Sequence, residues 1–169
     1  GISGGEYATR GFIDAYDPET GERLWRFNTI PGPGEPGSET WPNDPDILAK
    51  GGGGTWMNGS FDPELSLIYW GVGNPNPDYY GDSRPGDNLY SNSLVALDAD
   101  SGELQWHYQF TPHDLNDWDS NHMPVLADIQ WQGQPRRVGM VGNRDDLGAG
   151  DRGGWQADRV KRWQQGLPA

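Results

Sequence analysis

The feature that most constrains the fold is a segment that occurs twice. The sequence A-Y-D-P-E-T-G-E-R-L-W starts at Ala15, and A-L-D-A-D-S-G-E-L-Q-W starts at Ala96, 81 positions later. The shared Asp and Gly are typical of a tight turn, and the final Trp falls on the strand that returns from it. The spacing equals two steps of about 40 residues, the period of β-propeller blades. Because one blade cannot bury its own faces, the repeat predicts stacked blades with each Trp docked between neighbours.

Short hydrophobic runs bounded by turn residues predict a series of hairpins. The expected strands cover 12–16 and 22–27, 60–61 and 67–72, the two arms of 93–110, and 123–129 with 136–141. The 26 Gly and 14 Pro exclude a helix bundle, because its helices need long apolar stripes without breakers. We therefore expect an all-β fold whose core depends on large aromatic side chains, among them nine Trp.

The formal net charge of −13 limits the partners. Binding to nucleic acid is not expected, because phosphate contacts need clustered Lys and Arg. No apolar run approaches the ~20 residues that span a bilayer, so no membrane span is expected. The sequence contains no Cys, which leaves the redox compartment open. It starts Gly-Ile-Ser without Met, which suggests a fragment or a processed product.

A long loop is expected over 28–54, and loops of this length are usually functional or linkers. It ends in four successive glycines, which are followed by Thr55 and Trp56. Such a run lets the backbone pass close to a ligand and brings an indole against it. Trp56 could equally enter a strand as a residue of the propeller core, and the sequence leaves both interpretations open.

A second long loop is expected over 76–90. Asn74 precedes it, at a strand end where Pro75 stops pairing, so its side chain can point into a cavity. Arg84 and Asp87 lie within the loop, where we expect solvated side chains, with a loop that lines the funnel of the propeller as the alternative.

The segment 111–121, TPHDLNDWDSN, is dense in oxygen donors. Such a loop is either a solvated turn or a cation site, because hard cations take carboxylate and amide oxygens. Its candidate groups are Asp114, Asn116, Asp117, Asp119 and the imidazole of His113. We expect Asp114 to form a turn and His113 to make a structural hydrogen bond, with an acid/base role for His113 as the alternative.

Seven segments together resemble the quinoprotein alcohol dehydrogenases, the methanol/ethanol dehydrogenase family that uses pyrroloquinoline quinone (PQQ). In chain order they are GISGGE, AYDPETGERLW, GGGGTW, YWGVGNPNP, ALDADSGELQW, TPHDLNDWD and the Asn-Arg pair at 143–144. The resemblance covers 1–144 and implies an eight-bladed β-propeller, of which this chain would supply about two to three four-stranded blades. Residues 145–169 are expected to be an irregular tail outside the resemblance, or the product of a shifted reading frame.

The resemblance also implies roles for individual residues. The cation would be held by Glu6, Asn74, Asp117 and Asp119, and PQQ by Ser3, Gly4, Gly5, Trp56 and Arg144. Trp56 would stack under the plane of PQQ, and Arg144 would hydrogen-bond its reactive carbonyl oxygen. Asp117 would serve as the general base.

Asp119 bears on the choice of cation. An Asp two residues after the catalytic Asp is a feature of the family's lanthanide-dependent members, whereas Ca²⁺-dependent members carry a small or uncharged residue there. The surrounding NDWDSN departs from the family's usual WDYDG. Ca²⁺ and a lanthanide ion therefore both stay open.

The activity that the resemblance implies is oxidation of a primary alcohol to an aldehyde, with hydride transfer to metal-bound PQQ. It further implies a periplasmic location and a c-type cytochrome as electron acceptor, which an acidic surface suits. Two alternatives stay open: a non-catalytic scaffold built from the same propeller repeat, and an inactive truncated gene product. The sequence does not identify the alcohol.

Overall fold

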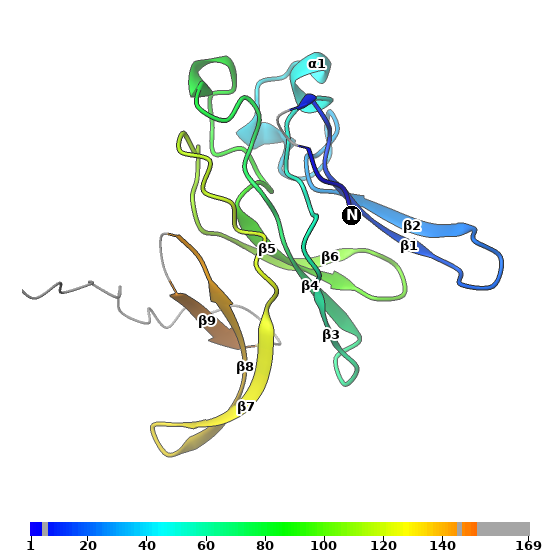
Figure 1. Ribbon diagram of the computed structural model, residues 1–169, viewed down its shortest axis with the longest axis vertical. Helices are drawn as coiled ribbons and strands as arrows, with labels where there is room; N and C mark the ends of the chain where they lie inside the picture. Colours follow the sequence, from blue (N-terminus) through cyan, green and yellow to red (C-terminus); the bar gives the residue numbers. More distant parts are fainter. Residues whose placement is uncertain (5–6, 145–146, 152–169) are drawn as a thin grey trace, which may run out of the picture.

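The computed structural model describes residues 1–4, 7–144 and 147–151 (Figure 1). The described strands are β1 (Phe12–Tyr16), β2 (Arg23–Asn28), β3 (Ser60–Asp62), β4 (Leu67–Gly71), β5 (Ser93–Asp98), β6 (Leu104–Gln109), β7 (Val125–Trp131), β8 (Gln134–Gly142) and β9 (Leu147–Asp151). The helical elements with defined bounds in these ranges are α1 (Pro45–Leu48) and the 3₁₀ turns η2 (Ser38–Thr40) and η3 (Gly81–Ser83). The predicted all-β class is confirmed, and so are the predicted hairpins.

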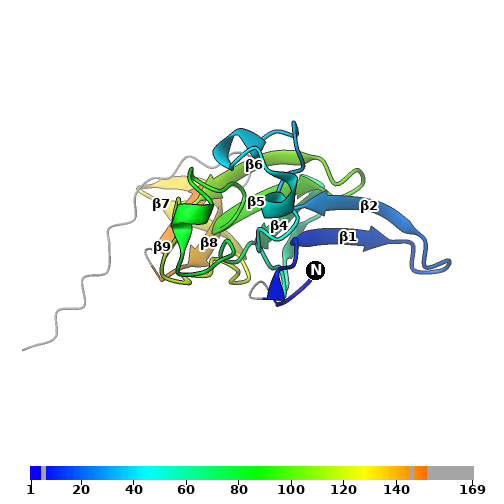
Figure 2. The same ribbon diagram turned by 90° about the horizontal axis from the view of Figure 1, so that it is seen from above.

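The strands form three antiparallel sheets in chain order, β1-β2, β3-β4-β5-β6 and β7-β8-β9. The central sheet is one complete four-stranded blade. Viewed from above, the three sheets follow one another from right to left (Figure 2). The architecture is that of part of a β-propeller, as the sequence predicts.

The repeat spacing has a different origin from the one we expected. Its second copy lies on β5 and β6, the last two strands of the central blade, and its first copy lies on β1 and β2. Both copies pair their Ala with their Trp, Ala15 with Trp25 and Ala96 with Trp106, and both have a register irregularity next to that Ala. The expected two steps of about 40 residues are therefore wrong. The 81-residue spacing is one blade that is lengthened by its long loops.

The docking of the repeat Trp is confirmed for Trp25. Its Nε1 donates a hydrogen bond to the carbonyl of Ala99, at 3.1 Å, in the turn of the next repeat copy. Its indole also covers Gly102, where an added Cβ would lie 2.5 Å from the ring. The β1-β2 sheet is thereby attached to the central blade through the repeat motif itself.

Strand β5 forms the centre of the core because both of its faces are buried. Val95 and Leu97 pack with Ile13 and Trp25 of the β1-β2 sheet. On the opposite face, Leu94 and Ala96 pack in a second cluster with Tyr69, Trp106 and Val141, which reaches β8. A strand buried on both faces reads as a continuous apolar run, which explains the sequence SLVAL.

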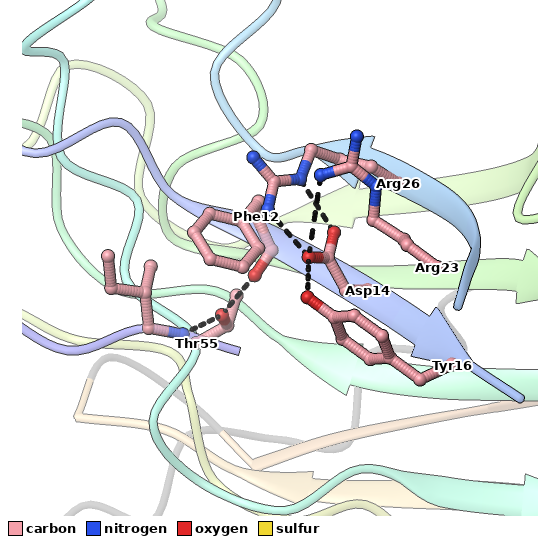
Figure 3. A network of polar contacts seen from close by, with 7 residues as sticks. Phe12, Asp14, Tyr16, Arg23, Arg26 and Thr55 are labelled. Atoms are coloured by element: carbon pink, nitrogen blue, oxygen red, sulfur yellow. Dashed lines mark hydrogen bonds and ion pairs between the residues drawn. The ribbon is translucent and has the colours of Figure 1, made fainter. Parts of the chain in front are cut away.

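The β1-β2 hairpin carries a polar network on its surface (Figure 3). The carboxylate of Asp14 accepts two hydrogen bonds of 2.6 Å from Arg26 and one of 2.9 Å from the hydroxyl of Tyr16. The hydrogen bond from Arg26 holds the pKa of Asp14 below its ordinary value. The guanidinium of Arg26 also lies over the ring of Phe12, 3.8 Å from its centroid.

The same hairpin is joined to the chain that leads into Trp56. The hydroxyl of Thr55 donates to the carbonyl of Phe12, at 2.6 Å, and accepts from the peptide nitrogen of Ile2, at 3.0 Å (Figure 3). The peptide nitrogen of Thr55 donates to the carbonyl of Ile2, at 2.7 Å. Ile2, Thr55 and Phe12 are therefore held next to one another.

One expectation for the chain's end is wrong. We predicted an irregular tail from Asp145, but Leu147–Asp151 forms β9 and pairs with β8. Its backbone pairs with β8 in an antiparallel register, from Leu147 opposite Gly142 to Asp151 opposite Val138. Residues 152–169 lie outside the described part. Within the described part, no helix has the length and apolar character needed to cross a membrane.

Candidate functional site

The long loops gather at one end of the sheets. Figure 1 shows the β2–β3, β4–β5 and β6–β7 connections at the upper end of the view. Among the hydrogen bonds that join them, Gly73 N donates to the Gly54 carbonyl, at 2.8 Å, and Asn74 N donates to Asp119 Oδ1, at 3.0 Å. Segments that are far apart in the sequence therefore meet where β4 ends.

Asn74 has a side-chain amide with one free end. The residue is 3 % exposed, and its Nδ2 donates to Asp78 Oδ1, at 2.6 Å, and to the Pro75 carbonyl, at 3.1 Å. Within the described ranges, no group donates a hydrogen bond to its Oδ1. An amide oxygen held in this way fits a hard cation, which takes oxygen ligands, and the peptide nitrogen of the same residue is bound to the carboxylate of Asp119.

Trp56 flanks this point with its ring. A Cβ on Gly73 would lie 2.8 Å from Asp119 Oδ1 and 2.9 Å from the indole, and one on Gly54 would lie 2.8 Å from the same ring. Trp56 is 43 % exposed in this chain, so it does not belong to the core of the described residues. The missing side chains of the two glycines let the indole approach the backbone closely, and part of the ring stays open to a planar ligand.

Asp117 and Arg144 lie next to each other. Nη1 of Arg144 donates to the carbonyl of Asp117, at 3.0 Å, and the hydroxyl of Tyr79 donates to Asp117 Oδ2, at 3.4 Å. The backbone of Asp117 has a φ of 59°, a left-handed conformation that costs energy for a residue with a Cβ. The negative charge of Asp117 raises the pKa of Tyr79, because a phenolate would form beside a carboxylate.

Ser3 and Gly4 lie on the segment that pairs with Thr55, the residue before Trp56. Gly4 has a φ of 89°, and its carbonyl accepts hydrogen bonds of 3.0 Å from Tyr7 N and from the hydroxyl of Thr9. Gly5 and Glu6, the other two residues predicted here, lie outside the described residues. In the part of the chain that the structure does describe, no three His, Cys, Asp or Glu side chains form a metal-binding cluster.

Asp114 forms a turn, as predicted. It is buried, and its carboxylate accepts hydrogen bonds from Asn116 N at 2.8 Å, from Trp118 N at 2.7 Å and from Asn92 Nδ2 at 2.7 Å. His113 Nδ1 lies 2.9 Å from the carbonyl of Gly86, to which it donates, in agreement with the expected structural hydrogen bond.

Three residues near the site were missed or misjudged. Arg84 is fully buried, so the expectation of a solvated side chain is wrong. Asp78 and Tyr79 were not singled out, although they contact Asn74 and Asp117. The only signal was that both closely follow Asn74 in a loop whose purpose the sequence left open.

Comparison with known proteins gives a consistent result. Residues 3–145 match the sequence profile of the PQQ-type glucose/ethanol/alcohol dehydrogenase β-propeller domain. The chain is 45 % identical over 150 residues to a quinohemoprotein alcohol dehydrogenase of Comamonas testosteroni, covering 82 % of this chain and 21 % of the relative. It is 37 % identical over 155 residues to a lanthanide-dependent methanol dehydrogenase of Methylorubrum extorquens, covering 80 % of this chain and 25 % of the relative.

Solved structures agree in fold. The Comamonas testosteroni enzyme superposes with a TM-score of 0.82 at 40 % identity, covering 93 % of this chain and 26 % of that one. A europium-containing methanol dehydrogenase superposes with a TM-score of 0.84 at 32 % identity, covering 92 % of this chain and 30 % of that one. The chain thus spans only about a fifth to under a third of the length of these relatives.

Proposed function

The chain belongs to the family of PQQ-dependent alcohol dehydrogenases and forms part of their β-propeller. On this premise we propose that its loop end contributes a face that binds a cation and PQQ. The complete enzyme would oxidise a primary alcohol to an aldehyde. The observation that carries the proposal is the meeting of Asn74, Asp119 and Trp56. The amide oxygen of Asn74 accepts no hydrogen bond from the described residues, the peptide nitrogen of the same residue is bound to the carboxylate of Asp119, and the indole of Trp56 is partly exposed. The cation would bind to the oxygen atoms, and the planar cofactor would lie against the aromatic ring.

The cation would be held by the amide oxygen of Asn74 and the carboxylates of Asp119 and Asp117, with Glu6 as a further ligand. We assign it to the class of Ca²⁺ and the lanthanides, since these ions take several hard oxygen ligands. Asp119 adds negative charge next to Asn74, and such charge favours a trivalent ion more than a divalent one.

PQQ would lie against Trp56, beside the backbone of Ser3, Gly4 and Gly5. When bound, PQQ supplies the two-electron acceptor for the hydride that leaves the alcohol carbon. Asp117 would take the proton from the alcohol hydroxyl. Arg144, whose guanidinium is hydrogen-bonded to the carbonyl of Asp117, brings a positive charge to the same place.

The partners follow from the resemblance and from charge. A periplasmic location and a basic c-type cytochrome as electron acceptor suit a chain with a net charge of −13. A cytochrome that binds equally well at low and high ionic strength would contradict this electrostatic attraction.

A second candidate is an inactive fragment. The chain spans 21 % of the Comamonas testosteroni relative, so most of the propeller is contributed by sequence that is not present here. Cofactor binding by this chain separates the two candidates.

The test is to measure by equilibrium dialysis how much PQQ binds to the chain with and without La³⁺. We expect PQQ to bind only when the cation is present, and we expect Asn74→Ala to weaken that binding about 10-fold or more, the usual loss for a disturbed metal site. Asp100→Ala, an exposed carboxylate in the β5–β6 turn, is the matched control and should bind like the wild type. Binding of PQQ that ignores both the cation and Asn74 would refute the proposed face.

A further inference from the structure

The loop that separates β4 from β5 contains a fully buried guanidinium, that of Arg84. Its Nε and Nη2 donate to the carbonyl of Pro77, at 3.0 and 2.9 Å, and Nη2 also donates to the carbonyl of Asp78, at 3.3 Å. Nη1 donates to Asn88 Oδ1, at 2.8 Å, and Nη2 reaches the carbonyl of Asp114. One planar group therefore binds two different loops.

Burying this charge is costly. Desolvation lowers the pKa of Arg84, although the nearby negative charges of Asp114 and Asp78 act to raise it. A buried guanidinium is tolerated only where hydrogen-bond acceptors satisfy its N–H groups. For Arg84, most of these acceptors are backbone carbonyls, whose positions are fixed by the fold. Arg84 is thus suited to fix backbone geometry.

A second connection runs beside the first. Asn92, also fully buried, donates from Nδ2 to Asp114 Oδ2, at 2.7 Å. The other bonds of the Asp114 carboxylate go to the peptide nitrogens of Asn116 and Trp118, which flank Asp117. The conformation of the segment that holds Asp117 therefore depends on Asp114, and Asp114 is bound from the opposite loop at both its carbonyl and its carboxylate.

The two loops joined in this way are those of the proposed cation site. Pro77 and Asp78 closely follow Asn74, and the side chain of Asp78 holds the amide of Asn74. We propose that Arg84 is a positioning residue that sets the separation between the amide oxygen of Asn74 and the carboxylates of Asp117 and Asp119. This inference rests on the proposed function, because it concerns how that cation site is kept in register.

The experiment is a titration of the chain with Tb³⁺, whose emission is sensitised by nearby indoles such as Trp56. Emission lifetimes in H₂O and D₂O then count the waters on the bound ion. Arg84→Lys keeps the charge but loses the fork that binds several carbonyls at once. We expect about 10-fold weaker Tb³⁺ binding, the usual loss for a disturbed outer shell, and about one more water on the ion.

Arg26→Lys is the matched control, because Arg26 makes a comparable two-pronged contact, to Asp14, on the β1-β2 hairpin. It should leave both the affinity for Tb³⁺ and the water count unchanged. A purely structural role for Arg84 would lower the unfolding temperature without adding a water to the bound ion.

Unchanged affinity and hydration in a folded Arg84→Lys chain would overturn the inference. If circular dichroism shows that this variant does not fold, Asn88→Gly decides in the same way, because it removes the side-chain acceptor of Arg84 Nη1 while glycine adopts the backbone φ of 61° found there. A wild-type chain that binds no Tb³⁺ would overturn the proposed function and this inference together, whereas wild-type binding with an indifferent Arg84→Lys would overturn the inference alone.

Discussion

A buried amide has two donors and one acceptor to satisfy, and Asn74 shows the consequence at the scale of single residues. Asp78 and the Pro75 carbonyl take both donors, so the orientation of the amide is set and its oxygen faces the remaining direction. The carboxylate of Asp119 accepts a hydrogen bond from the peptide nitrogen of the same residue. In the proposed cation site, these hydrogen bonds would order the ligands before any ion arrives and so reduce the free energy needed to order them on binding.

Tyr79 gives a pH-dependent test at this scale. Its phenol ionises above its ordinary pKa because a negative charge would appear beside Asp117. Replacing that carboxylate by an amide in Asp117→Asn removes the repulsion, so the pKa of Tyr79 should fall towards its ordinary value. The measurement is the difference between phenolate absorbance titrations of variant and wild type, which isolates one of seven Tyr. Superimposable titrations would show that Asp117 and Tyr79 are not in contact.

At the scale of elements, the repeat motif joins neighbouring sheets by a contact between a Trp and a Gly. Gly21 and Gly102 are equivalent positions in the two copies, with φ values of 73° and 74°. Gly102 is covered by Trp25, whereas an added Cβ at Gly21 would meet nothing within 4 Å. The same backbone turn therefore has a docking role in one copy and none within the described chain in the other.

This pair provides a stability prediction with a built-in control. Gly21→Ala should cost about 1–2 kcal/mol of unfolding free energy, the usual penalty for a left-handed backbone. Gly102→Ala should cost a further 1–3 kcal/mol, roughly the cost of overpacking, because its Cβ would overlap the indole of Trp25. Urea unfolding of both variants measures the difference. Equal losses would mean that Trp25 does not dock on the β5–β6 turn.

At the scale of the whole molecule, local sequence signals predicted the hairpins and the blade-to-blade Trp, because turn residues and alternating apolar residues act over short distances. They did not predict that β3 and β4 belong to the same blade as the second repeat, since loop length hides the blade period. They also failed for Arg84. A buried charge is satisfied by carbonyls from distant loops, and no residue pattern near Arg84 reveals that.

The site was predicted mainly through resemblance to a family. The structure joins Asn74 to Asp119 and Asp117 to Arg144, while Gly5 and Glu6 lie outside the described residues. Asp78, which holds the amide of Asn74, could be found only from the folded loop.

The proposal on which the predicted activity depends most is that the loop end of this propeller segment binds a hard cation between Asn74 and Asp119. The most direct measurement is an anomalous difference map from crystals of the chain grown with Eu³⁺. We predict a peak at a ligand distance of about 2.3–2.6 Å from Asn74 Oδ1, by analogy with Ca²⁺ sites, and next to the Asp119 carboxylate. Peaks only at exposed surface carboxylates, with none at Asn74, would show that no cation binds between Asn74 and Asp119.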